Sequence, residues 1–259
     1  MKNIIMFDID NTLFDHYKHE VPASTIKALK LLQKHDNLIG LASGKYPQYI
    51  ETFLKPFGIN ITTYVAFNGN YVVYQNQLIY DNPLPPALTI KFEKYCLKNN
   101  LPFVYVTTAG VLTKFWHNEI IAAYYNYFSN TTTVKPVSSV DYPRIYQLSV
   151  MISKENEQQI ISLFPEFAFI RINPFGMNVV LNDGLKEKGL KKILAYAQID
   201  STKLIAFGDD LNDIGMLKLA HIGVALGNAA EEVKEVATFC ADHISDDGIY
   251  KACQALKLF

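Results

Sequence analysis

The sequence has few of the features that mark basic, disulfide-bonded or membrane proteins. Lys and Arg number 24 against 25 Asp and Glu, so the net charge of -1 does not favour a general nucleic-acid binder. Cys96, Cys240 and Cys253 form no close pair, which indicates neither a disulfide framework nor a zinc site. The uncharged stretch 56–80 is interrupted by polar residues and indicates strands and turns rather than a membrane span.

The first ten residues also lack the length and apolar character of a secretory signal. We therefore expect a cytoplasmic protein. Nothing in the composition implies a nucleic acid, a membrane or another protein as its partner.

The chain alternates short apolar runs with amphipathic segments at both ends. Apolar runs at 4–9, 38–42 and 64–67, separated by helical patterns, predict βαβ units and a parallel sheet. The same rhythm resumes from Lys188, with strands near 204–207 and 222–225. We therefore predict an α/β fold, with a doubly wound, Rossmann-like parallel sheet as its core.

A change of rhythm in the middle of the chain indicates an inserted domain. Three prolines between residues 83 and 86 make a stiff connection, and a mixed pattern follows. We predict a core of residues 1–82 and 183–259 and an inserted α+β domain of residues 83–182. Its expected helices lie near 87–99, 118–128 and 154–164, and its strands near 103–107, 111–116, 146–152, 167–172 and 178–181.

Acidic residues follow two of the predicted core strands. Asp8 and Asp10 end the first strand and point to the same side, because strand side chains alternate. Residues 208–213, Gly-Asp-Asp-Leu-Asn-Asp, follow a later strand. Ligands of such sheets bind at the carboxyl ends of the strands, and clustered carboxylates need a cation, for which all-oxygen ligands suit Mg²⁺. The plainer interpretation is a strand ending in solvated acids, with Asp210 as a helix cap.

Weaker signals lie between these two acidic segments. Ser43, Gly44 and Lys45 follow the second strand, where a hydroxyl and exposed amides can hold an anion. Lys186 and Lys188 precede the resuming helix. Each signal alone is more typical of a turn or a solvated lysine, but together they predict a pocket of mixed charge.

Taken in order, these segments resemble the four motifs of the haloacid dehalogenase (HAD) superfamily, and in particular the Cof-type sugar phosphatases of subclass IIB. Residues 7–13 resemble the first motif, Asp-x-Asp-x-Thr, and residues 41–45 the second. Residues 188–190 resemble the third and residues 208–213 the fourth. The resemblance runs essentially end to end, and the insertion matches a C2-type cap. The usual C-terminal run is matched by residues 216–217, 223–229 and 247–249.

The sequence departs from the family pattern at two positions. Lys45 stands where Arg is usual, which replaces a planar fork of donors by a point charge. Asn11 stands where Gly is common. The lysine of the third motif is also open between Lys186 and Lys188, and the glycine that follows, Gly189, favours Lys188.

The resemblance implies a Mg²⁺-dependent phosphatase of small phosphorylated metabolites, in particular sugar phosphates. Asp8 would form an aspartyl-phosphate and Asp10 would act as acid and then base. The cap would close over the site and supply specificity for the leaving group. The implied metal residues are Asp8, Asp10 through its backbone carbonyl, Asp209 and Asp213; the phosphate-binding residues are Ser43, Gly44, Lys188 and Asn212; the substrate-binding residues are Lys45 and Asn68.

Two other functions fit the same residues. A phosphosugar mutase shares the fold and the nucleophile, but would return an isomer rather than free phosphate. A non-catalytic regulatory module that binds phosphate is compatible with the fold alone, because one fold hosts many functions. The presence of Asp8, Asp10, Ser43, Lys188 and Asp209 together favours catalysis.

Overall fold

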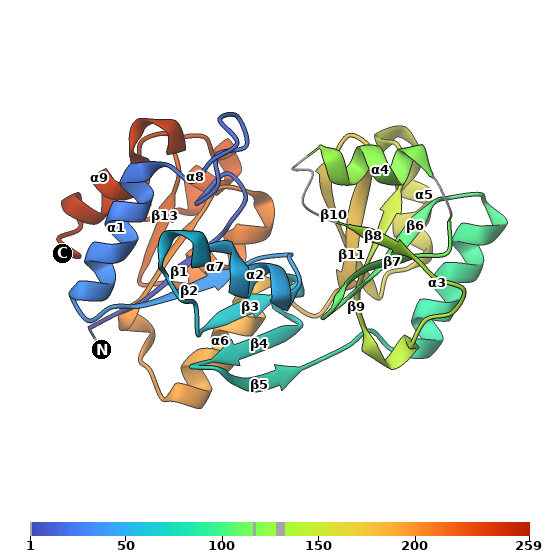
Figure 1. Ribbon diagram of the computed structural model, residues 1–259, viewed down its shortest axis with the longest axis horizontal. Coiled ribbons are helices and arrows are strands. Elements are labelled where there is room, and N and C mark those ends of the chain that lie inside the picture. The colour runs from blue at the N-terminus through green and yellow to red at the C-terminus, as the bar shows by residue number, and fades with distance from the viewer. Residues whose placement is uncertain (1, 116–117, 128–132) are drawn as a thin grey trace. The chain divides into compact units, whose positions relative to one another are not determined.

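The chain folds into two compact units, each with its own β-sheet (Figure 1). The computed structural model describes residues 2–115, 118–127 and 133–259. Unit 1 comprises Met1–Lys45, Tyr49–Asp81 and Leu185–Phe259, and unit 2 comprises Tyr46–Gln48 and Asn82–Gly184. The α/β class predicted from the sequence is confirmed.

Unit 1 contains a sheet that is parallel over most of its width. Its eight strands, among the described residues, run in the order β14-β13-β12-β1-β2-β3-β4-β5. Pairing is parallel from β14 to β3 and antiparallel from β3 to β5. The β4-β5 hairpin and the short β14 extend the sheet beyond the expected core strands. The strands are β1 (Ile4–Phe7), β2 (Leu38–Ala42), β3 (Tyr64–Ala66), β4 (Tyr71–Tyr74), β5 (Gln77–Asp81), β12 (Leu204–Gly208), β13 (Ile222–Ala225) and β14 (Phe239–Cys240).

Strand β1 lies at the centre of this sheet and is wholly buried. On one face, Ile4 and Met6 pack in a cluster with residues of α6, α7 and α8, among them Leu190. Helices α1 and α9 pack against one another elsewhere in the unit (Figure 1). The four residues of β1, Ile4–Phe7, are all apolar, as is usual for a parallel strand buried on both faces. The helices of the unit are α1 (Ala23–Lys34), α6 (Lys186–Ala197), α7 (Ile214–Leu219), α8 (Glu231–Val236) and α9 (Gly248–Ala255); α2 (Pro47–Phe53) begins in residues grouped with unit 2.

Helix α6 begins at Lys186, two residues before the predicted start at Lys188. Gly184 turns the chain just before it with φ of +103°, a conformation that glycine adopts without strain. Three residues into the helix, a Cβ on Gly189 would lie 2.5 Å from Cγ1 of Val65 on β3. Gly189 therefore lets α6 pack closely on the sheet.

Unit 2 has a mixed sheet that is antiparallel except at one edge. Its six described strands run in the order β10-β11-β9-β6-β7-β8, with β7 and β8 parallel. Phe92, Phe103 and Phe164 belong to its apolar core. The expected α+β pattern is confirmed, while Trp116 and Phe128, at the ends of two expected elements, lie outside the described residues. The elements are α3 (Pro86–Lys98), β6 (Phe103–Thr107), β7 (Gly110–Thr113), α4 (Glu119–Asn126), β8 (Val134–Pro136), β9 (Ile145–Met151), α5 (Glu157–Leu163), β10 (Phe167–Asn173) and β11 (Gly176–Leu181).

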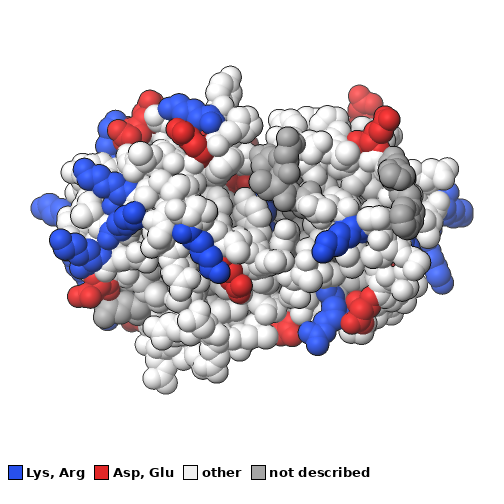
Figure 2. Space-filling model, viewed as in Figure 1, with Lys and Arg blue, Asp and Glu red and all other residues white. Residues whose placement is uncertain are grey.

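The surface charges agree with the near-neutral composition. On the face drawn in Figure 2, basic and acidic side chains of the described residues are interspersed. None of the helices in the described ranges has the length and apolar character needed to cross a membrane.

The close packing of Gly189 predicts an unusual response to alanine. Alanine normally stabilises a helix interior relative to glycine by up to about 1 kcal/mol. At this position the new methyl group would meet the stiff, buried side chain of Val65, and overpacking of this kind costs about 1–3 kcal/mol. We expect Gly189→Ala to lower the melting midpoint followed by circular dichroism.

Gly215→Ala is the matched control. Gly215 is also a helical glycine, but a Cβ there would meet Oε2 of Glu187, at the far end of a flexible side chain that can move aside. We expect it to change stability by less than about 1 kcal/mol. Equal melting midpoints for the two variants would contradict the close packing of α6 on β3.

Candidate active site

Polar side chains from four neighbouring strands gather at one edge of the unit 1 sheet. Asp209 follows β12, Asp8 follows β1, Ser43 follows β2 and Asn68 follows β3. These strands are adjacent in the order β12-β1-β2-β3 and run parallel. The residues therefore lie at the carboxyl ends of the strands, where open α/β sheets bind their ligands.

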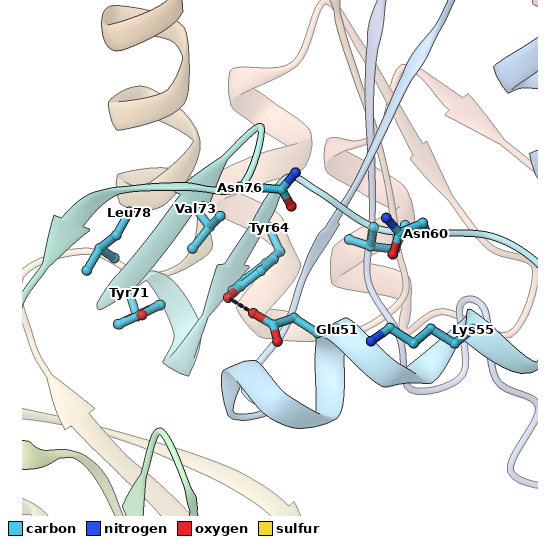
Figure 3. A pocket seen from close by; sticks show the side chains of 9 residues that line it. Glu51, Lys55, Asn60, Tyr64, Tyr71, Val73, Asn76 and Leu78 are labelled. Atoms are coloured by element: carbon cyan, nitrogen blue, oxygen red, sulfur yellow. Dashed lines mark hydrogen bonds between the residues drawn. The ribbon is translucent and has the colours of Figure 1, made fainter.

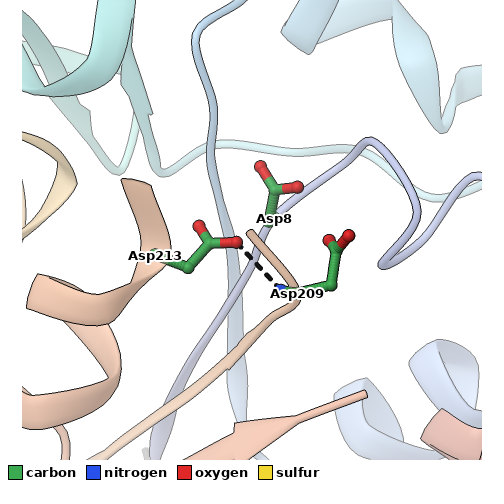
Figure 4. A group of neighbouring side chains, drawn as sticks. All are labelled: Asp8, Asp209 and Asp213. Atoms are coloured by element: carbon green, nitrogen blue, oxygen red, sulfur yellow. Dashed lines mark hydrogen bonds between the residues drawn. The ribbon is translucent and has the colours of Figure 1, made fainter. Parts of the chain in front are cut away.

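Three buried carboxylates form the centre of this edge (Figure 4). One oxygen from each of Asp8, Asp209 and Asp213 lies within 4.8 Å of the others. Asp213 is held by the backbone, because its Oδ2 accepts the N–H groups of Asp209 at 2.9 Å and Asp210 at 3.1 Å. Thr12 Oγ1 donates to Asp209 Oδ1 at 2.7 Å. The group is the one set of three such ligands found among the described residues.

Lys186 lies between two of these acids. Its Nζ donates to Asp8 Oδ1 and to Asp213 Oδ1, each at 2.5 Å. The side chain is 1% exposed. Burial would lower the pKa of Lys186, but Asp213 and Asp8 outweigh it and raise the pKa above its ordinary value. Lys186 therefore carries its charge inside the protein as the partner of two carboxylates.

This geometry favours Lys186 over Lys188 as the lysine of the third motif. Lys188 Nζ instead donates to Asn70 Oδ1 at 2.8 Å and lies 5.8 Å from the centre of the Tyr80 ring. The preference for Lys188 rested on the glycine that follows it. The structure gives Gly189 another role, because it lets α6 pack closely on Val65. The early start of α6 places Lys186, in its first turn, beside the acids.

The acidic group holds three carboxyls against one ammonium. Burial raises the pKa of Asp8 to about 8, with Lys186 opposing and Asp213 adding to the rise. Burial, with the charges of Asp8 and Asp213, also raises the pKa of Asp209 well above its ordinary value. Three buried carboxylates with one ammonium call for a further cation to keep all three ionised. Closely spaced oxygen ligands of this kind fit Mg²⁺.

Asp10 lies beside this group but its carboxylate has other partners. Lys45 Nζ is 3.0 Å from Oδ2 and His16 Nε2 is 2.8 Å from Oδ1. Burial would raise the pKa of Asp10, but Lys45 and His16 outweigh it and hold the pKa well below its ordinary value. In this arrangement Asp10 is ionised. Asn11, which follows, has φ of +56°, which accounts for Gly or Asn at this position.

Short polar contacts connect the remaining predicted residues. Ser43 is fully buried, and its Oγ accepts the backbone N–H of Lys45 at 3.2 Å. A Cβ on Gly44 would lie 2.9 Å from Asn68 Nδ2. Asn212 Nδ2 donates to Asn68 Oδ1 at 3.0 Å. The second-motif loop thus packs closely on Asn68, which is hydrogen-bonded to Asn212.

Thr12 and His16 contact the acids although the sequence analysis assigns them no role. Thr12 belongs to the first motif, so its position carried a signal. His16 lies in a loop with no recognisable pattern, and only the folded chain brings it to Asp10.

A separate cavity of about 340 Å³ opens between α2 and strands β3, β4 and β5 (Figure 3). Tyr64 Oη donates to Glu51 Oε1 at 2.6 Å inside it. Burial and this carboxylate raise the pKa of Tyr64, so the hydroxyl stays neutral. None of the predicted site residues lines the cavity. Its lining is Glu51, Lys55, Asn60, Ile61, Tyr64, Tyr71, Val73, Asn76 and Leu78.

Comparison with known proteins covers nearly the whole chain. Residues 5–253 match the family model described as haloacid dehalogenase-like hydrolase. A Bacillus subtilis (strain 168) protein named "Putative phosphatase YkrA" is 31% identical over 265 residues, covering 98% of both chains. The solved structure of the HAD subclass IIB sugar phosphatase BT4131 has a TM-score of 0.88 and 28% identity, covering 99% of this chain and 100% of its own. A Geobacillus kaustophilus HTA426 structure has a TM-score of 0.88 and 31% identity over the full length of both chains.

The three clustered carboxyls, which only a further cation would let ionise together, predict that Mg²⁺ stabilises the protein. A cation bound only by the folded state at a hundred times its Kd adds about 2.7 kcal/mol. We therefore expect added MgCl₂ to raise the melting midpoint, and EDTA to reverse the rise. The midpoint can be measured by calorimetry.

Asp209→Asn is the variant that tests this site. It removes one carboxylate from the buried group, so we expect the metal-free midpoint to stay level or rise and the Mg²⁺ effect to disappear. Asp246→Asn, at an exposed position in unit 1, should keep the full Mg²⁺ effect. An undiminished Mg²⁺ effect in Asp209→Asn would exclude this group as the metal site.

Proposed function

The chain belongs to the haloacid dehalogenase-like hydrolase family, and on that basis we propose that it is a Mg²⁺-dependent phosphatase. Its substrates in this proposal are small phosphorylated metabolites, in particular sugar phosphates. The sugar phosphatase among its structural relatives supports this choice of substrate class.

The observation that carries the proposal is the buried group at the strand ends. Asp8 is held by Lys186 on one side and lies within ligand distance of Asp209 and Asp213. Lys186 keeps the Asp8 carboxylate in place, and a bound Mg²⁺ would screen its charge. Asp8 could then approach an anionic phosphate. Solvated acids at the end of a strand would be neither buried nor paired in this way.

In the first step of the proposed reaction, Asp8 attacks the phosphorus of the bound monoester. A bond forms between its carboxylate oxygen and phosphorus as the bond to the leaving oxygen breaks, and the product is an aspartyl-phosphate. Asp10 gives a proton to the leaving alkoxide. In this proposal Ser43, the backbone amide of Gly44 and the ammonium of Lys186 bind the phosphoryl oxygens. Mg²⁺, when bound by Asp8, Asp209 and Asp213, would offset the negative charge of the two reactants.

In the second step, Asp10 takes a proton from water. The water oxygen bonds to phosphorus, and the bond to Asp8 breaks to release inorganic phosphate. The ionised state of Asp10 beside Lys45 and His16 suits this step. For the first step Asp10 must carry a proton. The bound substrate must therefore draw the positive charge of Lys45 away from Asp10.

The second unit has a proposed role as the cap that selects the leaving group. In this proposal residues 83–182 form the inserted domain and residues 1–82 and 183–259 the catalytic core. The specificity then varies with unit 2, while Lys45 and Asn68 of unit 1 contact the substrate near its phosphate.

The direct test is phosphate release from a panel of sugar and nucleotide monophosphates. We expect release with Mg²⁺, none with EDTA, and a loss of at least about a thousandfold in Asp8→Asn, because the nucleophile is removed. Asp246→Asn serves as the exposed control and should match the wild type.

The same assay separates the alternatives. A mutase would convert a sugar phosphate into its isomer, which chromatography detects, with little free phosphate. A regulatory module would bind Mg²⁺ and phosphate without turnover of any panel member. Wild-type release by Asp8→Asn would remove the assignment of the nucleophile.

The two lysines of α6 provide a further prediction. Lys186→Met leaves Asp8 and Asp213 buried without their partner, a change that costs about 3–5 kcal/mol when one member of a buried pair is removed. We expect a large fall in both the melting midpoint and phosphate release. Lys188→Met, on the same helix, takes this donor from the buried Oδ1 of Asn70 and should cost about 1–3 kcal/mol, less than Lys186→Met. Greater loss of activity in Lys188→Met, with both variants folded, would restore Lys188 as the phosphate-binding lysine.

A further inference from the structure

The carboxylate of Asp10 has one donor on each oxygen, and the two donors differ in rigidity. His16 Nε2 is 2.8 Å from Oδ1, and Lys45 Nζ is 3.0 Å from Oδ2. An ionised carboxylate only accepts hydrogen bonds, so whenever Asp10 is ionised the proton of this contact is on His16 Nε2. Lys45 ends a flexible four-carbon chain, whereas the imidazole is a ring on a short stem.

The loop around His16 is held on both sides of the residue. Before it, the Phe14 ring packs edge to face against the His16 imidazole, with ring centroids 4.9 Å apart. It packs in the same way against the Phe53 ring, with centroids 6.4 Å apart. Asp15, also before His16, is buried, and its Oδ1 accepts the backbone N–H groups of the two residues after His16, Tyr17 at 2.9 Å and Lys18 at 3.1 Å.

A second contact ties this turn to the C-terminal part of the unit. Asp15 Oδ2 accepts a short hydrogen bond from Ser245 Oγ. The backbone groups of Asp15 and Glu20 also pair across the loop. The imidazole of His16 is therefore presented to Asp10 from a fixed position, with 16% of its side chain exposed.

We propose that His16 is a positioning residue that holds Oδ1 of Asp10, so that Oδ2, the oxygen facing Lys45, is turned to the leaving group and then to water. The inference rests on the proposed phosphatase reaction and adds a residue to it. The more mobile Lys45 can leave Oδ2 when the substrate arrives, while the His16 contact keeps the carboxylate from rotating.

The first-turnover rate of leaving-group release separates this role from general structural support. p-Nitrophenolate leaves without a proton, whereas a sugar alkoxide needs one from Asp10. Loss of the His16 contact should therefore slow sugar release about tenfold more than p-nitrophenol release, a part of the roughly 10²–10⁴-fold that a general acid contributes. The measurement uses rapid quench with p-nitrophenyl phosphate and with the sugar monophosphate that the wild type hydrolyses fastest.

Three variants make the test specific. His16→Asn is too short to reach Asp10 and should show the unequal loss. His16→Gln places an amide N–H near the position of Nε2 and should recover most of the sugar-release rate. His19→Asn lies in the same loop at an exposed position with φ of +55°, which asparagine tolerates, and should behave as the wild type.

The outcomes are distinct. Equal slowing of both substrates in His16→Asn, or no slowing of either, would overturn the positioning role. Failure of His16→Gln to recover the rate beyond His16→Asn would also overturn it, and this comparison holds even if His16→Asn is unstable. Failure of the wild type to release phosphate from any substrate would overturn the proposed function instead.

Discussion

The contact of Lys186 with Asp8 and Asp213 is the interaction on which the site depends. A buried carboxylate is unfavourable without a partner, and this ammonium serves two of them at 2.5 Å each. It joins the end of β1, the segment after β12 and the first turn of α6, which are remote in sequence. Positive charge at this point lets the central strands of the sheet end in acids without losing the fold.

The packing of the sheet sets where that ammonium lies. Gly184 turns the chain and Gly189 lets α6 approach β3, so the first turn of the helix is fixed beside the carboxyl ends of the strands. Gly69, in the turn after β3, lets the residue before α6 approach in the same way, because a Cβ there would lie against the carbonyl oxygen of Leu185. These three glycines thus set the position of the Lys186 ammonium, although they do not contact it.

Much of this arrangement follows from local pattern in the sequence. The positions of β1, β2, β3, β12 and β13 and the placing of Asp8 and Asp209 at one edge come from buried apolar runs, whose carboxyl ends coincide in a parallel sheet. The choice between Lys186 and Lys188 does not follow from local pattern, because it depends on the exact residue at which α6 begins. His16 is further from prediction, since its contact arises from the path of an irregular loop.

The remaining charges explain how one site holds two neighbouring aspartates in different states. Burial and like charges raise the pKa of Asp8 to about 8, while Lys45 and His16 overcome burial and lower the pKa of Asp10. A divalent cation would reverse the first effect, because it favours the ionised form of Asp8. A bound phosphate would compete for Lys45 and so weaken the lowering of the Asp10 pKa. Each component of the proposed reaction therefore shifts the aspartate it meets toward the form that the reaction needs: the nucleophile toward carboxylate and the acid toward its protonated form.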